Sequence, residues 1–324
     1  MPRTDLQRRA FARDVHDGLA SAQKSLPSVY FYDERGSELF RQIMELPEYY
    51  LTRAERQILE RHGSRLAAPF RAAPCDVVDL GAGDGTKARL LLEELRAVGA
   101  DVRYCPIDVS ETALLTVLGA CARDLPWLAT ESVVAEYAAG IRWVAAQGGA
   151  RRRLVLLLGS NIGNLDDGAA RAFFRDLRGA LREGDHVLVG FDLVKDAAVL
   201  QRAYDDGAGI TAEFNLNLLR RINGELGGTF EPENFRHFAA FSPARRAMES
   251  YLLSRRRQTA LVEGRAYDFD AWEPIHTEIS RKYRERDVTA FALEAGFVEV
   301  AHFLDEERLF VDAFWRVGPA AGTP

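Results

Sequence analysis

A glycine-rich stretch that follows an apolar run is the part of this sequence most suited to ligand binding. Residues 79–85 read DLGAGDG, with glycine at every second position from Gly81 onward. Glycine lets a backbone approach a ligand closely, and the start of a following helix offers unpaired N–H donors. The spacing is not that of a dinucleotide fingerprint, because Thr86 stands where its third glycine is needed, and the P-loop pattern is also absent. The turn therefore predicts a different nucleoside-containing ligand.

The complete pattern, D-x-G-x-G-x-G, is typical of nucleoside-dependent methyltransferases. An acidic residue before the turn, Asp79, suits a cationic ligand better than a pyrophosphate, and S-adenosylmethionine carries both a sulfonium and an amino group. The alternative is a strand, turn and helix with a purely structural role. We predict that S-adenosylmethionine is the cofactor and that Gly81 and Gly83 bind it.

A second acid stands where a ribose-binding residue is expected. Residues 104–110 (YCPIDVS) form a short predicted strand that ends in Asp108, 23 residues after Gly85. An acid at the end of the second strand of such a fold accepts hydrogen bonds from ribose hydroxyls. The alternative role is that of a helix N-cap, for which Ser110 is a rival. We predict the ribose role for Asp108.

Two further strand ends carry polar side chains. Residues 132–137 (SVVAEY) are predicted to form the third strand, with Glu136 accepting from an adenine amino group and Tyr137 flanking the ring; a plain loop acid is the alternative reading of Glu136. Residues 153–158 (RLVLLL) are an apolar strand that leads into GSNIGN, where Asn161 and Asn164 face the ligand crevice.

These segments need a parallel sheet to position them. Strands alternate with helices up to a fifth strand at residues 187–194, and this order predicts a doubly wound, Rossmann-like α/β fold. The tail departs from that pattern. Residues 197–226 are predicted to be helical, parts of 235–262 alternate like antiparallel strands, and a helix at 287–295 precedes a strand pair at 298–303 and 309–315.

Composition excludes several classes of protein. The 324 residues are 47% hydrophobic and 28% charged, with a formal net charge of −6. Mild acidity argues against a nucleic-acid partner, and the arginine runs at 151–153 and 255–257 are predicted to be solvated. No segment approaches the roughly 18 apolar residues of a membrane span, and the three scattered cysteines predict a reduced, cytoplasmic protein without a metal site.

The N-terminal 70 residues are too long for a tail and are rich in aromatic side chains. Four tyrosines lie beside two proline-bounded turns between residues 24 and 55, which suggests an aromatic lid. We predict that residues 1–70 and 197–285 form a substrate-binding cap. Residues 71–196 and 286–324 are then the S-adenosylmethionine-binding core.

Taken together, the chain resembles the histidine Nα-methyltransferase family of ergothioneine biosynthesis over nearly its full length. The resemblance rests on eight segments in order: SLPSVYFYDERGSELF, LPEYYLTRAE, DLGAGDGTK, PIDVS, LLGSNIGN, GFDLVKD, AYDDGAGITAEFNLNLLRRIN and HTEISRKY. It implies transfer of three methyl groups from S-adenosylmethionine to the α-amino group of histidine, which gives hercynine.

The resemblance also implies roles for particular residues. By motif, the family's carboxylate-binding residues fall on Asn164 and Tyr204, and its imidazole-binding residues fall on Glu278 and Ser280. The tyrosines that line the amine correspond to Tyr32, which is the catalytic candidate, and Tyr49. The residues in matching positions for the cofactor are Gly81, Lys87, Asp108, Glu136 and Tyr137.

One position departs from the family pattern and keeps alternatives open. A methionine familiar in the substrate pocket is replaced by Ser250, after Glu249. Methylation of another amino-acid amine, such as that of tryptophan or a derivative, is therefore the main alternative function. A protein that binds S-adenosylmethionine without turnover is a more remote one, because Tyr32, Asn164 and Glu278 are all present.

Overall fold

The computed structural model describes residues 5–319, and these divide into two compact units. Unit 1 contains the chain up to Tyr50 together with Lys195–Ser280, and unit 2 contains Leu51–Val194 together with the chain from Arg281 onward. The first boundary lies 20 residues before the expected one at residue 70 (70 − 50). The reason is that helix α3 (Tyr50–Ala67) belongs to unit 2 for all but its first residue.

Unit 2 is built on an eight-stranded sheet with the strand order β12-β13-β6-β5-β1-β2-β3, and β4 also pairs with β2. The central strands are parallel and the last two are antiparallel. The strands are β1 (Pro74–Leu80), β2 (Asp101–Asp108), β3 (Ala129–Thr130), β4 (Val133–Val134), β5 (Arg152–Leu157), β6 (His186–Asp192), β12 (Phe297–Leu304) and β13 (Phe310–Val317).

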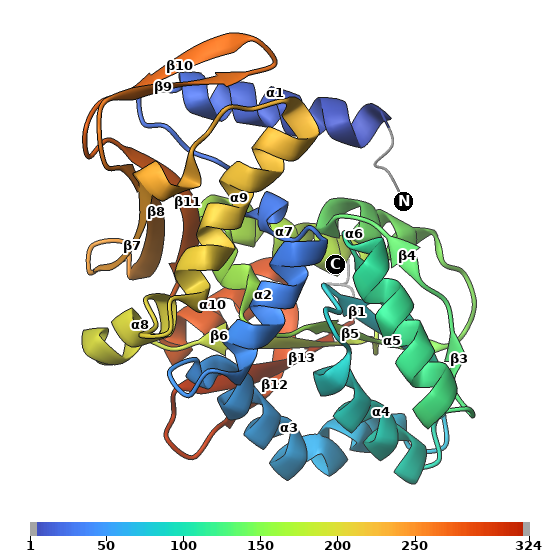
Figure 1. Cartoon of the computed structure of the whole chain (residues 1–324). Helices are drawn as coiled ribbons and strands as arrows, with labels where there is room; N and C mark the ends of the chain where they lie inside the picture. Colours follow the sequence, from blue (N-terminus) through green and yellow to red (C-terminus); the bar gives the residue numbers. More distant parts are fainter. Residues whose placement is uncertain (1–4, 320–324) are drawn as a thin grey trace, which may run out of the picture. The chain divides into compact units, whose positions relative to one another are not determined.

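Helices cover both faces of this sheet (Figure 1), so the prediction of a doubly wound α/β fold is confirmed. Aromatic and aliphatic side chains of α6, α7 and α10 pack with the strands in one apolar core, while α3, α4 and α5 lie on the other face. The helices of unit 2 are α3, α4 (Thr86–Ala97), α5 (Glu111–Asp124), α6 (Tyr137–Ala146), α7 (Asp167–Ala180) and α10 (Glu285–Ala295), with short 3-10 turns η2 (Ala68–Phe70) and η3 (Asn161–Asn164).

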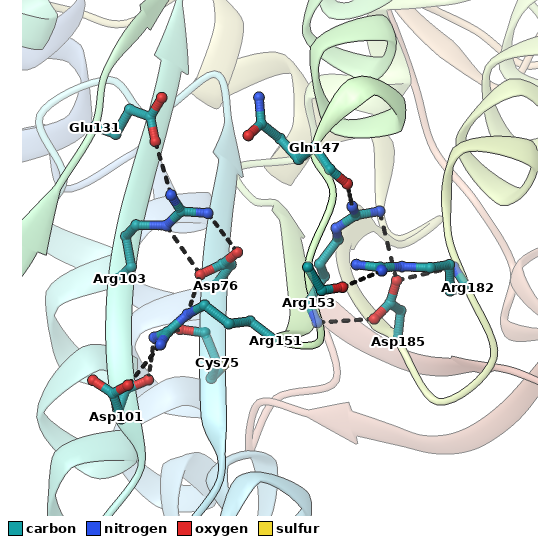
Figure 2. A network of polar contacts seen from close by, with 11 residues as sticks. Cys75, Asp76, Asp101, Arg103, Glu131, Gln147, Arg151, Arg153, Arg182 and Asp185 are labelled. Atoms are coloured by element: carbon teal, nitrogen blue, oxygen red, sulfur yellow. Dashed lines mark hydrogen bonds and ion pairs between the residues drawn. The ribbon is translucent and has the colours of Figure 1, made fainter.

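Charged residues close the amino ends of the parallel strands (Figure 2). Asp76 of β1 accepts hydrogen bonds from Arg103 Nη2 at 2.7 Å and from Arg151 Nε at 2.7 Å, and Asp185 accepts from the Arg153 N–H at 2.9 Å. Arg153 is buried, so the expectation that residues 151–153 form a solvated run is wrong. These charges satisfy one another, so this end of the sheet has a structural role, and ligands of such folds bind at the opposite, carboxyl edge.

Unit 1 combines helices with two small antiparallel sheets. Its elements are α1 (Asp5–Ala20), η1 (Ser28–Phe31), α2 (Glu34–Glu45), α8 (Ala197–Tyr204), α9 (Ile210–Leu226), η4 (Pro232–Asn234), β7 (Phe235–Ser242), β8 (Ala247–Ser254), β9 (Gln258–Val262), β10 (Arg265–Phe269) and β11 (Pro274–Arg281). The strand order is β11-β8-β7 in one sheet and β10-β9 in the other. Helix α9 packs against α2 and β7, and α1 lies beside the β9–β10 hairpin (Figure 1), where Arg8 forms an ion pair with Glu263. Helix α9 is therefore the central scaffold of this unit.

No helix among residues 5–319 is both long enough and apolar enough to cross a membrane. The three cysteines are buried free thiols, and burial raises the pKa of Cys105 to about 12. These thiols accordingly have a packing role.

Candidate functional site

The glycine turn after β1 has the backbone conformation that its composition predicts. Gly81, Gly83 and Gly85 have φ angles of 78°, 57° and 72°, in the left-handed region where a side chain is strained. The N–H groups of Gly81 and Ala82 both donate to the Ile107 carbonyl of β2, at 2.8 and 3.3 Å. The turn is thus fastened across the carboxyl ends of the first two strands.

Polar groups from two other segments converge on Gly81. A β-carbon at this position would lie 3.0 Å from Asn161 Nδ2 and 3.0 Å from the Tyr137 hydroxyl oxygen, whereas one at Gly83 would meet no atom within 4 Å. The space beside Gly83 is therefore open, and the space beside Gly81 is bounded by an amide and a phenol. Asn161, which the sequence placed on a ligand-facing loop without a specific role, belongs to this group.

Asp108 is bonded to the glycine turn itself. Its carboxylate accepts from the Gly83 N–H at 3.1 Å and from the Ser110 N–H at 2.9 Å, and burial raises its pKa. Ser110 is the N-cap of α5, accepting from the Ala113 N–H at 3.2 Å, so Asp108 does not have that role. The ribose-binding role of Asp108 stays a prediction.

The Asp108→Ala substitution is expected to weaken binding of S-adenosylmethionine by about 1.5–3 kcal/mol, the range for hydrogen bonds to charged groups. It removes the predicted acceptor for the ribose and releases the Gly83 N–H. Titration calorimetry with S-adenosylhomocysteine measures the loss. Unchanged affinity in a folded variant would remove Asp108 from the site.

The third predicted strand is much shorter than expected. Only Val133 and Val134 pair with β2, and Glu136 and Tyr137 are the N-cap and first residue of α6 rather than the end of a strand. The segment lies at the edge of the sheet, where little of it is buried, so its strand-like composition does not produce a long ladder. Glu136 is exposed and Tyr137 is half-buried, with its ring edge-on to Phe173; their cofactor roles stay predictions.

Asp79 is buried beneath the turn. The Tyr104 hydroxyl donates to its carboxyl group at 2.7 Å. Burial raises the pKa of Asp79 to about 7, and Asp108 and Glu55 add to that effect against the opposing influence of Tyr104 and Lys87. At neutral pH this carboxyl group is therefore poised between its neutral and ionised forms.

This raised pKa predicts that the free protein loses stability as pH rises. Asp79 ionises near its ordinary value of 3.8 in the unfolded chain but near 7 in the folded one, so ionisation disfavours folding by at most about 4 kcal/mol, with the loss developing between those values. The Asp79→Asn variant should be more stable relative to the wild type at about pH 8 than at about pH 5, as measured by urea unfolding.

Asp76, on the same strand, is the matched control. Burial alone would raise its pKa, but Arg103 and Arg151 outweigh burial and lower it. Asp76→Asn should therefore destabilise the protein equally at about pH 5 and about pH 8, because the carboxylate is ionised in both states. A stability difference between Asp79→Asn and the wild type that is identical at both pH values would contradict the assignment.

Lys87, in the first turn of α4, has a buried partner that the sequence did not indicate. Its ammonium donates to Glu55 Oε2 at 2.5 Å, and the Glu55 side chain is fully buried. Burial alone would lower the pKa of Lys87, but the Glu55 carboxylate outweighs burial and raises it. Lys87 is thus held as a cation beside the glycine turn.

The loop after β5 is tight and strained. Ser160 has a φ of 61°, and its hydroxyl accepts from the Asp192 N–H at 3.0 Å. The 3-10 turn η3 follows, with Asn161 at its start and Asn164 at its end. Asn164 lies in unit 2, whereas the other predicted substrate residues lie in unit 1.

In unit 1, two predicted substrate residues meet directly. The Tyr204 hydroxyl lies 2.7 Å from Ser280 Oγ, and both residues are buried. The backbone carbonyl of Tyr204 accepts from His237 Nε2 at 2.9 Å. Burial lowers the pKa of His237, so this imidazole is neutral and fixes the end of α8.

Glu278 lies two residues before Ser280 on β11 and is half-buried. Ser250 Oγ lies 3.5 Å from Glu278 Oε2, at the long limit of a hydrogen bond. Thr277, the residue before Glu278 on β11, donates to Asn215 Oδ1 of α9 at 2.8 Å. The position that departs from the family pattern therefore lies next to the predicted imidazole-binding acid.

Tyr32 and Tyr49 belong to an aromatic cluster that packs against helix α9 through Phe214. The Tyr32 ring packs edge-on against Phe40 and against Phe214 of α9, and Tyr49 packs edge-on against Phe40. Tyr49 is buried and Tyr32 is half-buried. Helix α9 thus supports the tyrosines through Phe214 and the β11 residues through Asn215.

Comparisons with known proteins show the family to which the chain belongs. The family described as "Histidine-specific methyltransferase, SAM-dependent" matches residues 11–317. A protein of Mycobacterium tuberculosis (strain CDC 1551 / Oshkosh) named histidine N-alpha-methyltransferase is 41% identical over 299 residues, 92% of each chain. A protein of the same name from Mycolicibacterium smegmatis (strain ATCC 700084 / mc(2)155) is 39% identical over 304 residues, 93% of each chain.

A more distant relative acts on a different amino acid. A protein of Claviceps purpurea named 4-dimethylallyltryptophan N-methyltransferase is 32% identical over 200 residues, which are 58% of this chain and 56% of that protein. A protein with a related sequence is therefore named for an indole-bearing substrate.

Proposed function

Since the chain belongs to the family of histidine-specific, S-adenosylmethionine-dependent methyltransferases, we propose that it converts L-histidine to hercynine by Nα-trimethylation, a step of ergothioneine biosynthesis. The observation that carries this proposal is the buried Tyr204–Ser280 pair, with Glu278 on the same strand. Two hydroxyls and a carboxylate in unit 1 supply the donors and acceptors that a histidine needs, which supports the proposal.

The residues at the carboxyl edge of unit 2 fit the methyl donor. Open space beside Gly83 admits a ligand against the backbone, and the Asp108 carboxylate stands at the end of β2 to accept from ribose hydroxyls. Asn161 and Tyr137 present polar groups beside Gly81, and Lys87 offers a cation for a carboxylate. When bound, S-adenosylmethionine supplies an electrophilic methyl group on its sulfonium.

The amino acid is held at both ends by groups of matching chemistry. Within unit 1, Tyr204 donates to its carboxylate and Glu278 accepts from an imidazole N–H, while the carboxylate-binding role of Asn164 rests on the family resemblance alone. Ser280 completes the contact with the ring, because its hydroxyl either donates or accepts. Two residues apart on one strand, Glu278 and Ser280 face the same side.

The tyrosines orient the reacting amine without stabilising its protonated form. Only a neutral amine has the lone pair needed for attack, and a carboxylate beside it would favour the ammonium. The hydroxyl oxygens of Tyr32 and Tyr49 accept from the amine N–H bonds and direct the lone pair at the methyl carbon. A nitrogen–carbon bond forms, the sulfur–carbon bond breaks, and the amine proton leaves to solvent; alignment contributes up to about 7–11 kcal/mol in such reactions.

Repeated transfer follows from the same geometry. A product with one or two methyl groups keeps a lone pair and can be aligned again. The trimethylated product has no lone pair left, and the sequence of transfers ends there.

Nα-methylation of another aromatic amino acid is the second candidate function. Ser250 leaves more room beside Glu278 than the methionine of the family pattern, and a relative is named for 4-dimethylallyltryptophan. Glu278 and Ser280 together favour histidine, because an imidazole offers both an N–H donor and an acceptor nitrogen, whereas an indole offers a single N–H donor.

The setting of this reaction is small-molecule metabolism. The substrate is a free amino acid, and the protein acts in the cytoplasm without a nucleic-acid or membrane partner. The formal net charge of −6 and the apolar surroundings of the cysteines support this assignment.

A panel of the twenty amino acids, each incubated with purified protein and methyl-labelled S-adenosylmethionine, tests the proposal. Transfer to histidine should exceed transfer to every other member. Preference for tryptophan would favour the second function, and binding of the cofactor without transfer to any amino acid would favour a non-catalytic protein.

A further inference from the structure

We propose that Glu55 is a positioning residue for the methyl donor: its carboxylate fixes the Lys87 ammonium and the Gly159 amide in one arrangement. The inference rests on the proposed function only in that unit 2 binds S-adenosylmethionine. All the groups involved lie in unit 2.

The Glu55 carboxylate joins two segments of the proposed donor site. It accepts from Lys87 Nζ, at the start of α4, at 2.5 Å. It also accepts from the Gly159 N–H, after β5, at 2.7 Å to Oε1 and 3.0 Å to Oε2. Helix α3 thereby ties the glycine turn to the loop that carries Asn161.

The missing side chain of Gly190 leaves the space that this carboxylate occupies. Glu55 is fully buried, and a β-carbon at Gly190 of β6 would lie 2.5 Å from its Oε1 and 2.9 Å from the Phe310 ring. A side chain at position 190 would therefore displace the carboxylate. Glycine in the middle of a central strand is otherwise unfavourable, and its close approach to Glu55 accounts for it here.

Asp312 is a second buried acid in this part of unit 2. It is fully buried on β13, directly opposite Gly190, and neither carboxyl oxygen has a hydrogen-bond partner among the described residues. Burial, followed by the charge of Glu55, raises its pKa well above the ordinary value. A neutral Asp312 can donate its own proton to Glu55, whereas two ionised carboxylates would repel each other.

The charged and titratable groups around Glu55 come from three elements. Lys87 faces it from α4, Asp79 from β1 and Asp312 from β13. With Asp312 neutral, Glu55 compensates Lys87 alone. The lysine ammonium has three N–H donors, one of which is used by Glu55, and so its orientation toward a bound carboxylate is set by this pair.

Binding of S-adenosylhomocysteine to the full-length protein tests the proposal by titration calorimetry. Glu55→Gln should raise the Kd at least about 10-fold, as should Lys87→Met. Because Glu55 acts through Lys87, the double variant should bind about as weakly as the weaker single variant. The Michaelis constant for S-adenosylmethionine should rise, and that for histidine should stay unchanged.

Asp76→Asn is the matched control, since it removes a buried, ion-paired carboxylate at the opposite edge of the same sheet (Figure 2). It should lower the unfolding temperature and leave the Kd within about 2-fold of the wild type. If Glu55→Gln does not fold, Glu55→Asp keeps the charge on a shorter side chain that no longer reaches both partners, and the same loss of affinity is expected.

Two results would overturn the proposal: wild-type affinity in a folded Glu55 variant, or additive losses in the double variant. Both are separable from failure of the proposed function. A wild-type protein that binds S-adenosylhomocysteine but does not methylate histidine would refute that function and leave the role of Glu55 testable by the same titration.

Discussion

Replacing Glu278 by alanine is expected to lower kcat/KM for histidine by about 10- to 150-fold, the equivalent of one hydrogen bond to a charged group. The variant loses the anion that accepts from the imidazole N–H. Relative to histidine, activity on larger aromatic amino acids should rise, because the vacated space admits a larger ring and the lost hydrogen bond is one that histidine uses. Steady-state kinetics with histidine and tryptophan measure both effects.

Glu273→Ala is the matched control for this prediction. Glu273 stands just before β11 and forms an ion pair with Lys24, so its loss removes a carboxylate from the same unit without touching Tyr204 or Ser280. The control should keep the wild-type ratio of histidine to tryptophan turnover. Equal losses for both amino acids in the Glu278 variant would mean that Glu278 does not select the ring.

The Tyr32→Phe variant is expected to lose turnover on the order of 100-fold while its KM for histidine changes little. The hydroxyl directs the amine lone pair, a contribution that counts mainly in the transition state. The ring itself should stay in place, because its edge-on contacts with Phe40 and Phe214 do not involve the hydroxyl. Single-turnover kinetics separate the chemical step from binding.

Tyr30, in the 3-10 turn η1 that precedes Tyr32, provides the control. Its hydroxyl donates to Asp14 at 2.6 Å, so Tyr30→Phe should lower the unfolding temperature without lowering kcat. If Tyr32→Phe instead behaves like Tyr30→Phe, the hydroxyl of Tyr32 has a packing role and another group orients the amine.

The central strands were predictable from sequence because they are buried on both faces. β1, β5 and β6 are buried along almost their whole length and rich in valine and leucine, which is typical of parallel strands inside a doubly wound sheet. The edge of the sheet was less predictable. β4 contains two residues where six were expected, because β-branched composition at an exposed edge does not determine how far pairing extends.

Buried acids were the main gap in the site prediction. Asp79 is the first residue of the glycine motif, but only the structure shows that it lies beneath the turn and accepts a hydrogen bond from Tyr104. Glu55 stands in a helix beside charged residues such as Arg53 and Arg56, where an acid normally indicates solvent. The feature that explains the buried carboxylate of Glu55 is its close approach to Gly190, and this contact can be recognised only in the three-dimensional structure.

The site residues differ in how far the structure relates them. Tyr204 and Ser280 are brought into contact, and Ser250 lies beside Glu278, although the sequence predicted neither contact. Glu136 is exposed at the start of α6, where the sequence predicted a strand end. The motif around Glu136 therefore did not predict the local backbone conformation.

Analysis of the methyl-transfer product tests the central claim most directly. Wild-type protein is incubated with L-histidine and an excess of methyl-labelled S-adenosylmethionine, and the product is examined by tandem mass spectrometry and NMR. We predict a single final product with three labelled methyl groups on the α-nitrogen and an unmodified imidazole. Methylation of a ring nitrogen, or no transfer to histidine by protein that binds the cofactor, would contradict the account.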